Sequence, residues 1–283
     1  MEAHITGFRA LIQKMDLTDL KCLCNKHLCI DYQSLDRRLG NGGRLILENY
    51  PADGIARPSV IITTLTEIDS KDCNVLLELK RPFFAAVAAV VAATASHVAP
   101  TVQQFELGKL LKFLSRYKHS IKQLDLAYLD TEKCLTEREV FHFCANSQDY
   151  CVGTLVKWRI PEIITKMNGN GVSQRRIKLG ISDSKSNYGV ICFAPKTGRV
   201  SVALKIRKKQ KIEYVLRDYG NYIQQQQDFQ ARCRALLVSC IDVITPRSKR
   251  ARVKAGYVRQ PSWASFLGQQ GRIEAINWSS MEG

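Results

Sequence analysis

Four residues of the types that bind zinc lie within eight positions near the N-terminus: Cys22, Cys24, His27 and Cys29. Thiolate and imidazole groups are common zinc ligands, and neighbouring ligands are usually separated by about two to four residues. Here a single residue separates Cys22 from Cys24 and His27 from Cys29. On a helix the first two side chains would point about 200° apart, so a tetrahedral site requires a loop. Buried thiols are the favoured alternative.

A second group, Cys134, His142, Cys144 and Cys151, has the same residue types at irregular spacing, which is a weak signal for zinc. Residues Met1 to Leu17 lack the apolar core of a secretory signal, so an intracellular protein with reduced thiols is expected. The sequence therefore predicts no bound metal and no cofactor.

Acidic residues supply the strongest enzymatic pattern, in which Asp69 is followed by Glu78-Leu-Lys80. This arrangement resembles the acid and Glu-x-Lys motif of the restriction-like nuclease superfamily, and the resemblance covers about residues 60 to 100. It implies that Asp69 and Glu78 would bind a divalent metal ion that activates water, and that Lys80 would steady the attacking hydroxide. The alternative is a charged, solvated strand end.

The net positive charge of the chain is confined to its C-terminal part. The first 150 residues contain 18 basic and 18 acidic residues, whereas residues 151–283 contain 24 basic and 8 acidic residues, which gives the net charge of +16. A half that contacts a polyanion, such as nucleic acid or an anionic membrane surface, is expected to show this asymmetry.

Alternating residues in this basic part predict four antiparallel strands, at about 176–181, 188–194, 199–206 and 211–217. Because strand side chains alternate between two faces, the apolar positions would be buried and the cations would share the other face. The expected nucleic-acid contacts are Arg176, Lys178, Lys205, Arg207, Lys208, Lys209, Lys211 and Arg217. A face of this kind can instead serve as a guard against edge-to-edge aggregation.

Aromatic residues that could stack on bases are few near this face, namely Tyr188, Phe193 and Tyr219. Readers of single-stranded RNA commonly use such stacking. The sequence therefore favours RNA or another single-stranded nucleic acid, bound with little sequence preference.

Two short basic runs fit a nuclear import signal, Lys208 to Lys211 and Lys249 to Arg252. The second follows Pro246, and Lys249, Arg250 and Arg252 are its basic residues. It predicts binding to an importin and a location in the nucleus, the cytoplasm or both. The same residues can act as a phosphate-binding arm.

Apolar spacing in the rest of the chain favours helices. A small helical module is expected at 1–50, and helices at 82–98, 102–114 and 121–129 follow a strand pair at 60–64 and 74–79. Thr136 and Glu139 fit a capping box. Asn168 to Gly171 favours a boundary, and a helix is expected from Tyr222 to Ile244.

These elements predict an α+β protein with a mostly helical N-terminal part and a C-terminal antiparallel β-meander covered by a helix. The expected domains are a small helical module at 1–50, a mainly helical middle region with a short strand pair at 51–168, a basic antiparallel sheet plus helix at 169–245, and a basic C-terminal tail at 246–283.

Nucleic-acid binding is the expected function, and a magnesium-dependent nuclease is the main alternative. The alanine-rich segment from Phe83 to Ala95 is too short to span a bilayer, but its small residues suit close helix packing. It supports a second alternative, a membrane-peripheral or assembly protein that self-associates.

Overall fold

The structure is a computed structural model of the whole chain. The residues that it describes are 5–28, 44–49, 57–64, 72–80, 84, 107–156, 161–167, 173–180, 187–194, 198–217, 222–246 and 258–268. They form two compact units, each built from separate stretches of the chain. Unit 1 comprises Met1–Ile5, Ala127–Lys208 and Gln230–Gly283, and unit 2 comprises Thr6–Leu126 and Lys209–Phe229.

The first described element is a long strand, β1 (Ile5–Asp16), which belongs to unit 2 from Thr6 onward, so the prediction of a helical N-terminal module is wrong. Phe8, Ala10 and Ile12 alternate into the core, which is the two-residue period of a strand. A β-bulge between Ile12 and Met15 shifts the phase, so that Met15 is also buried. The bulge makes the apolar spacing in the sequence resemble that of a helix.

The strands of unit 2 lie in the order β2 (Arg44–Asn49), β3 (Arg57–Thr64), β4 (Asp72–Leu79), β1 and β5 (Ile121–Leu129). The antiparallel pairing of β3 with β4 confirms the predicted strand pair. The helix predicted at 121–129 is wrong, because Leu124, Leu126 and Tyr128 are buried at every second position of β5.

Helices of unit 2 are α1 (Leu17–Cys22), the π-helix η1 (Leu23–His27), α3 (Leu107–Ser115) and α6 (Lys209–Leu216). α3 confirms part of the helix predicted at 102–114. α6 replaces the predicted fourth strand of the meander, because Ile212, Val215 and Leu216 are buried at helical spacing. Of the helix predicted at 82–98, only the helical residue Phe84 lies among the described residues.

Unit 1 contains the antiparallel meander, with strand order β10 (Arg199–Ile206), β9 (Tyr188–Ala194), β8 (Ser173–Gly180) and β7 (Glu162–Met167). The predicted strands at 176–181, 188–194 and 199–206 are therefore confirmed. The fourth strand is β7, which precedes them, and β7 pairs with β8 across the Asn168 to Gly171 turn signal.

The other elements of unit 1 are α4 (Glu137–Ala145), α5 (Ser147–Tyr150), the short strands β6 (Cys151–Val152) and β11 (Asp242–Val243), and α9 (Pro261–Phe266). Helix α7 (Tyr222–Cys240) has its C-terminal half in this unit. The capping box predicted for Thr136 and Glu139 is present at the start of α4.

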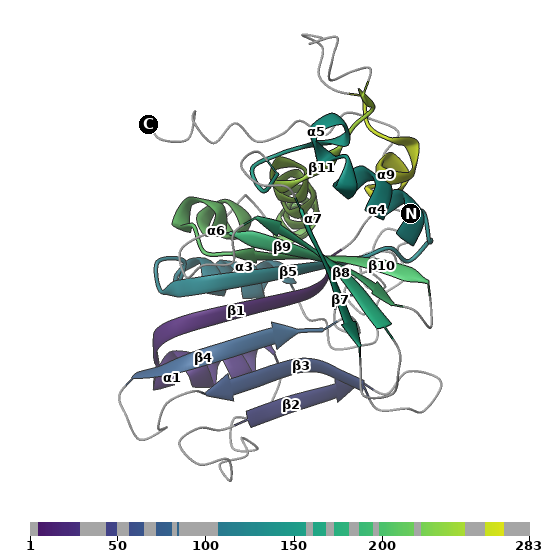
Figure 1. The fold of residues 1–283 in the computed structure, drawn as a ribbon. Coiled ribbons are helices and arrows are strands. Elements are labelled where there is room, and N and C mark those ends of the chain that lie inside the picture. Colours follow the sequence, from purple (N-terminus) through teal and green to yellow (C-terminus); the bar gives the residue numbers. More distant parts are fainter. Residues whose placement is uncertain are drawn as a thin grey trace, which may run out of the picture. The chain divides into compact units, whose positions relative to one another are not determined.

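Helices α4 and α7 cover the apolar face of unit 1 (Figure 1). The ring of Phe141 on α4 stacks on Phe193 of β9 with centroids 5.0 Å apart. The Tyr128 hydroxyl donates a 2.7 Å hydrogen bond to the Cys233 carbonyl of α7. The predicted antiparallel meander is therefore present in an α+β fold, and α4 packs on its apolar face. None of the helices in the described ranges is long and apolar enough to cross a membrane.

Candidate nucleic-acid interface

The face of the meander opposite α4 carries the basic side chains of β8 and β10. Along β10, Val200, Val202, Leu204 and Ile206 are buried, and the residues between them are half-buried. On β8, Ile177 and Leu179 are buried, and Arg176 and Lys178 are half-buried. We define the basic face by the five half-buried cations on its strands and at the end of β10: Arg176, Lys178, Arg199, Lys205 and Arg207.

Strand β9 runs between the two basic strands and fills the centre of the face with small side chains. Cys192 pairs with Arg176 on one side and Ser201 on the other, and Val190 pairs with Lys178 and Ala203. Because β8 and β10 both neighbour β9, they lie about 10 Å apart. Long cationic side chains on both sides can therefore reach a phosphate chain that lies over β9.

Cys192 lies at the centre of this face, and the pKa of its thiol is affected by the charge of Arg176. Burial raises the pKa of Cys192 above its ordinary value, and the positive charge of Arg176 offsets part of that shift. The offset requires the Arg176 guanidinium to lie close to the Cys192 thiol, as the strand register also indicates.

Asn187, which precedes β9, fixes the end of β10. Its side-chain oxygen accepts hydrogen bonds from the backbone N–H groups of Arg207, at 2.8 Å, and Lys208, at 3.2 Å. Asn187 is itself only 9% exposed, so it holds this turn from within the fold. The turn presents Lys208 and Lys209 to solvent, where both side chains are exposed.

Glu162 on the neighbouring β7 contributes an opposing charge to the basic face. Its carboxylate lies 3.7 Å from the Lys178 ammonium, and the two side chains are 53% and 29% exposed. An ion pair this exposed contributes little to stability, so a phosphate can compete for Lys178.

Of the predicted contacts, Arg176, Lys178, Lys205 and Arg207 lie together on the basic face, and Lys208 follows at its end. The predicted position of Lys211 is wrong, because α6 turns it inward and leaves it 5% exposed. Lys209 and Arg217 are exposed but belong to unit 2.

Arg199 was not among the predicted contacts. It is the first residue of the alternating run in β10, so the period-two pattern that places Lys205 on the face also places Arg199 there.

The stacking role suggested for Phe193 is wrong, since this ring is 5% exposed and packs against Phe141. Tyr219 and the side chain of Tyr188 lie outside the described residues.

The predicted import signal, Lys249, Arg250 and Arg252, also lies outside the described residues, and the structure resumes on either side of it at Pro246 and Val258. Thr245 N–H donates to the Val258 carbonyl at 2.8 Å, and Ile244 forms a β-bridge with Arg259. The predicted apolar anchors Trp263, Phe266 and Leu267 are buried, so residues 258–268 are packed into unit 1.

Both cysteine groups contain hydrogen-bonded or buried thiols. Burial and the neighbouring Cys73 raise the pKa of Cys24 to about 12, which opposes formation of a metal-binding thiolate. Cys144 and Cys151 are joined by a side-chain hydrogen bond, which together with burial raises the pKa of Cys144. Cys29 lies outside the described residues, and within them no group of three or more His, Cys, Asp and Glu side chains could hold a metal ion.

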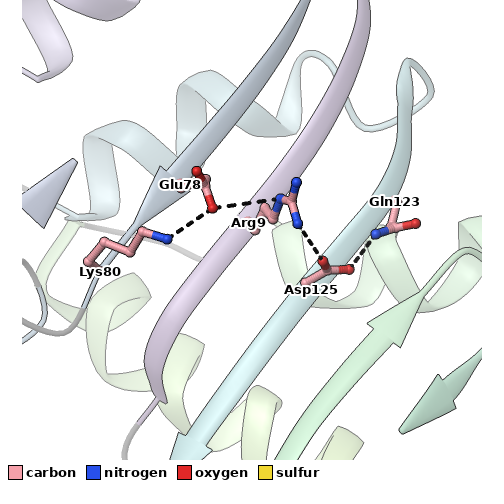
Figure 2. Close-up of polar contacts among 5 residues, drawn as sticks. All are labelled: Arg9, Glu78, Lys80, Gln123 and Asp125. Atoms are coloured by element: carbon pink, nitrogen blue, oxygen red, sulfur yellow. Dashed lines mark hydrogen bonds and ion pairs between the residues drawn. The ribbon is translucent and has the colours of Figure 1, made fainter. Parts of the chain in front are cut away.

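The Glu-x-Lys pattern lies on one face of unit 2, as Figure 2 shows, whereas Asp69 lies outside the described residues. The Lys80 ammonium is 2.9 Å from the Glu78 carboxylate, and Arg9 of β1 lies 3.7 Å from the same oxygen. Arg9 also lies 3.9 Å from Asp125 on β5, which accepts a 2.8 Å hydrogen bond from Gln123.

This chain of alternating charges joins three neighbouring strands of the sheet in unit 2. Two cations already neutralise Glu78, so the arrangement as it stands favours strand register over metal binding. Arg9 and Asp125 were missed at the sequence level, because their proximity to Glu78 depends on the order β4-β1-β5.

Comparison of the chain with known protein families, curated proteins and solved structures found no match.

Proposed function

We propose that this protein binds nucleic acid through the basic face, with RNA or another single-stranded nucleic acid as the ligand. The observation that supports the proposal is the register of β8, β9 and β10, which sets cations on both sides of a floor of small residues. One strand of nucleic acid fits over β9 with its phosphates toward Arg176 and Lys178 on one side and Lys205 on the other.

Electrostatics favour occupation of this face by a polyanion. Five cations gathered on one face attract a polyanion, and phosphates that bind there release counterions. Unit 1 contains 23 basic and 11 acidic residues by sequence, so its long-range field also attracts polyanions. Phosphate contacts position a nucleic acid without reading its sequence.

Low sequence preference follows from the floor of the face. Where side chains are described, the floor consists of Val190, Cys192, Ser201 and Ala203, which are too small to stack on bases. Specific readers of single-stranded RNA use aromatic or guanidinium planes for stacking. Backbone contacts by cations are therefore expected to dominate the affinity.

The test is fluorescence anisotropy with single-stranded RNA, single-stranded DNA and duplex DNA over a series of salt concentrations. Five phosphate contacts predict a slope of log affinity against log salt of about −3.5 for a single strand. The double variant Lys205→Gln/Arg207→Gln should reduce the magnitude of that slope by about 1.4 and weaken binding at least tenfold.

A matched control removes the same charge elsewhere on the surface. Lys122 of β5 and Arg138 of α4 are exposed and are not among the five cations that define the basic face. The variant Lys122→Gln/Arg138→Gln should change the slope by much less. Equal losses in both double variants would mean that net charge alone attracts nucleic acid, and the proposed interface would be wrong.

A magnesium-dependent nuclease is the second candidate, in which Glu78 of β4 would exchange its ion pairs with Lys80 and Arg9 for a metal ion. It predicts cleavage of the probe in magnesium that Glu78→Gln abolishes while binding through the basic face is retained. Retained cleavage in Glu78→Gln would exclude this residue as the metal ligand.

Flotation with anionic liposomes tests the membrane-peripheral alternative in the same preparations.

A further inference from the structure

Helix α3 in unit 2 carries exposed basic residues, although the first 150 residues contain equal numbers of basic and acidic residues. Lys109 and Lys112 of α3 are exposed three residues apart, so they share one side of the helix, and the exposed Arg116 directly follows its last residue. Leu110, Leu111, Phe113 and Leu114 are buried and anchor the helix in unit 2. The cations are therefore carried by a fixed element.

The π-helix η1 brings further basic groups to this side of α3. The His27 ring packs against the Phe113 ring with centroids 4.7 Å apart, and the Arg116 guanidinium lies 5.3 Å from the same ring. Phe113 is only 2% exposed, so one buried ring supports both side chains. Lys26, which is exposed, directly precedes His27. The π-helix η1 and the end of α3, which are far apart in the sequence, thus bring basic residues close to the Phe113 ring.

The charges at this point act on one another. Burial lowers the pKa of His27 most, and the positive charges of Arg116, Lys26 and Lys109 lower it further. Three cations therefore lie close enough to the imidazole to repel its protonated form. They would repel a zinc ion as well, which is a further argument against the zinc site at His27.

Asp19 on α1 supplies the opposing charge. Its carboxylate lies 3.4 Å from the Arg116 guanidinium and accepts a hydrogen bond from the Tyr117 hydroxyl. The Arg116 side chain is 61% exposed and that of Asp19 is 27% exposed, so the ion pair orients Arg116 without removing it from solvent.

We propose that Lys26, Lys109 and Arg116 form a phosphate-binding site, here called the α3 site, in which Phe113 and Asp19 hold Arg116 in place. A guanidinium can bind a phosphate with two parallel hydrogen bonds, and the two ammonium groups add point charges beside it. A phosphate dianion complements the positive charge of the three cations. The α3 site lies in a different unit from the basic face, so it goes beyond the proposed function and does not depend on it.

The phosphate can be free, as inorganic phosphate or a phosphorylated metabolite, or it can be the 5′-phosphate of a nucleic acid. Both have the same chemistry at the site. Inorganic phosphate and a short oligothymidylate with and without a 5′-phosphate distinguish these sources.

The experiment is a titration of the full chain with inorganic phosphate, followed by the backbone amide resonances in two-dimensional NMR. Saturable shifts are expected at Lys26, His27, Lys109 and Arg116. The variant Lys109→Gln/Arg116→Gln should lower the phosphate affinity at least tenfold, because it removes two charge-assisted contacts. The matched control Lys14→Gln/Lys122→Gln removes two other exposed cations of unit 2 and should leave the affinity within twofold.

The results separate the α3 site from the basic face. Lys205→Gln/Arg207→Gln should leave phosphate binding at α3 unchanged, whether or not it weakens nucleic-acid binding. Absence of saturable shifts near α3, or equal losses in the α3 variant and its control, would overturn the proposal. If the α3 site binds, preference for the 5′-phosphorylated oligonucleotide identifies a nucleic-acid end as the source, and equal affinity for inorganic phosphate identifies a free phosphate.

Discussion

Neighbouring lysines at the end of β10 differ in what they can contact. Lys208 and Lys209 are exposed, whereas Lys211 is 5% exposed because α6 turns it toward the side of the helix that carries Ile212. An exposed ammonium can bind a phosphate, while a buried one contributes to the interior of the fold. The number of basic residues in a segment therefore overstates the number available for binding.

At Gly153 the neighbouring backbone leaves no space for a side chain. It has φ of +127°, and a Cβ atom there would lie 2.5 Å from the carbonyl oxygen of Cys240. The adjacent N–H groups of Thr154 and Leu155 donate to the carbonyls of Ser239 and Cys240 at the end of α7, so this close approach satisfies the helix terminus. We predict that Gly153→Ala lowers the free energy of unfolding by about 3 kcal/mol or more, measured by urea denaturation.

Gly198 provides a matched control for this prediction. It also has a positive φ, of +64°, but an added Cβ would meet nothing within 4 Å. Gly198→Ala should therefore cost only the backbone term of about 1 kcal/mol. Equal costs for the two substitutions would show that the contact with Cys240 does not constrain the fold.

Elements with local signals were predictable from the sequence. The capping box of Thr136 and Glu139 needs only residues three apart, and the alternation in β10 is a property of one strand. The basic face was partly predictable for the same reason, because alternation alone puts Arg176, Lys178 and Lys205 on one side of their strands.

Other elements could not be predicted, because a short apolar run fits both the two-residue period of a strand and the period of about 3.6 residues of a helix. In α6, Ile212, Tyr214 and Leu216 recur at the two-residue spacing of a strand, whereas Ile212, Val215 and Leu216 recur at the spacing of a helix. Only packing in the folded protein decides between the two. In β1, the bulge after Ile12 conceals the alternation. The charge chain through Arg9 and the α3 site could not be predicted either, because they join residues whose proximity depends on the tertiary fold.

The turn at the end of β10 is held by the side chain of Asn187, and this role can be tested by substitution. Asn187→Ala leaves the N–H groups of Arg207 and Lys208 without their side-chain acceptor and should loosen the turn that presents Lys208 and Lys209. The expected result is a several-fold loss of affinity for single-stranded RNA at an unchanged salt slope, because no cation is removed. The measurement is the anisotropy salt series.

Asn146→Ala is the control for this prediction, because Asn146 is exposed at the end of α4 and donates to the His142 carbonyl. It should leave the RNA affinity unchanged. A reduced slope in Asn187→Ala would indicate that a phosphate contact is lost outright, which contradicts a purely positional role for this side chain.

Charge separation at the scale of the whole molecule follows the two units. By sequence, unit 1 has a net charge of +12 and unit 2 a net charge of +4, although both units draw on early and late parts of the chain. Most of the net positive charge that lies in the C-terminal part of the sequence is thus found in unit 1 of the folded protein. The proposed nucleic-acid contacts and the predicted import signal are both basic residues of unit 1, so the two roles must be distinguished by experiment.

Nuclear import is the prediction that tests this distinction. In cultured animal cells, a fusion of the chain to a carrier too large to diffuse through nuclear pores should accumulate in the nucleus. The triple variant Lys249→Gln/Arg250→Gln/Arg252→Gln should lose accumulation because importins bind such basic runs. The control Arg176→Gln/Lys205→Gln/Arg207→Gln removes the same charge from the basic face and should keep accumulation while losing RNA affinity in vitro. Accumulation lost only in the control would mean that nucleic-acid binding retains the protein in the nucleus, and that Lys249, Arg250 and Arg252 are not an import signal.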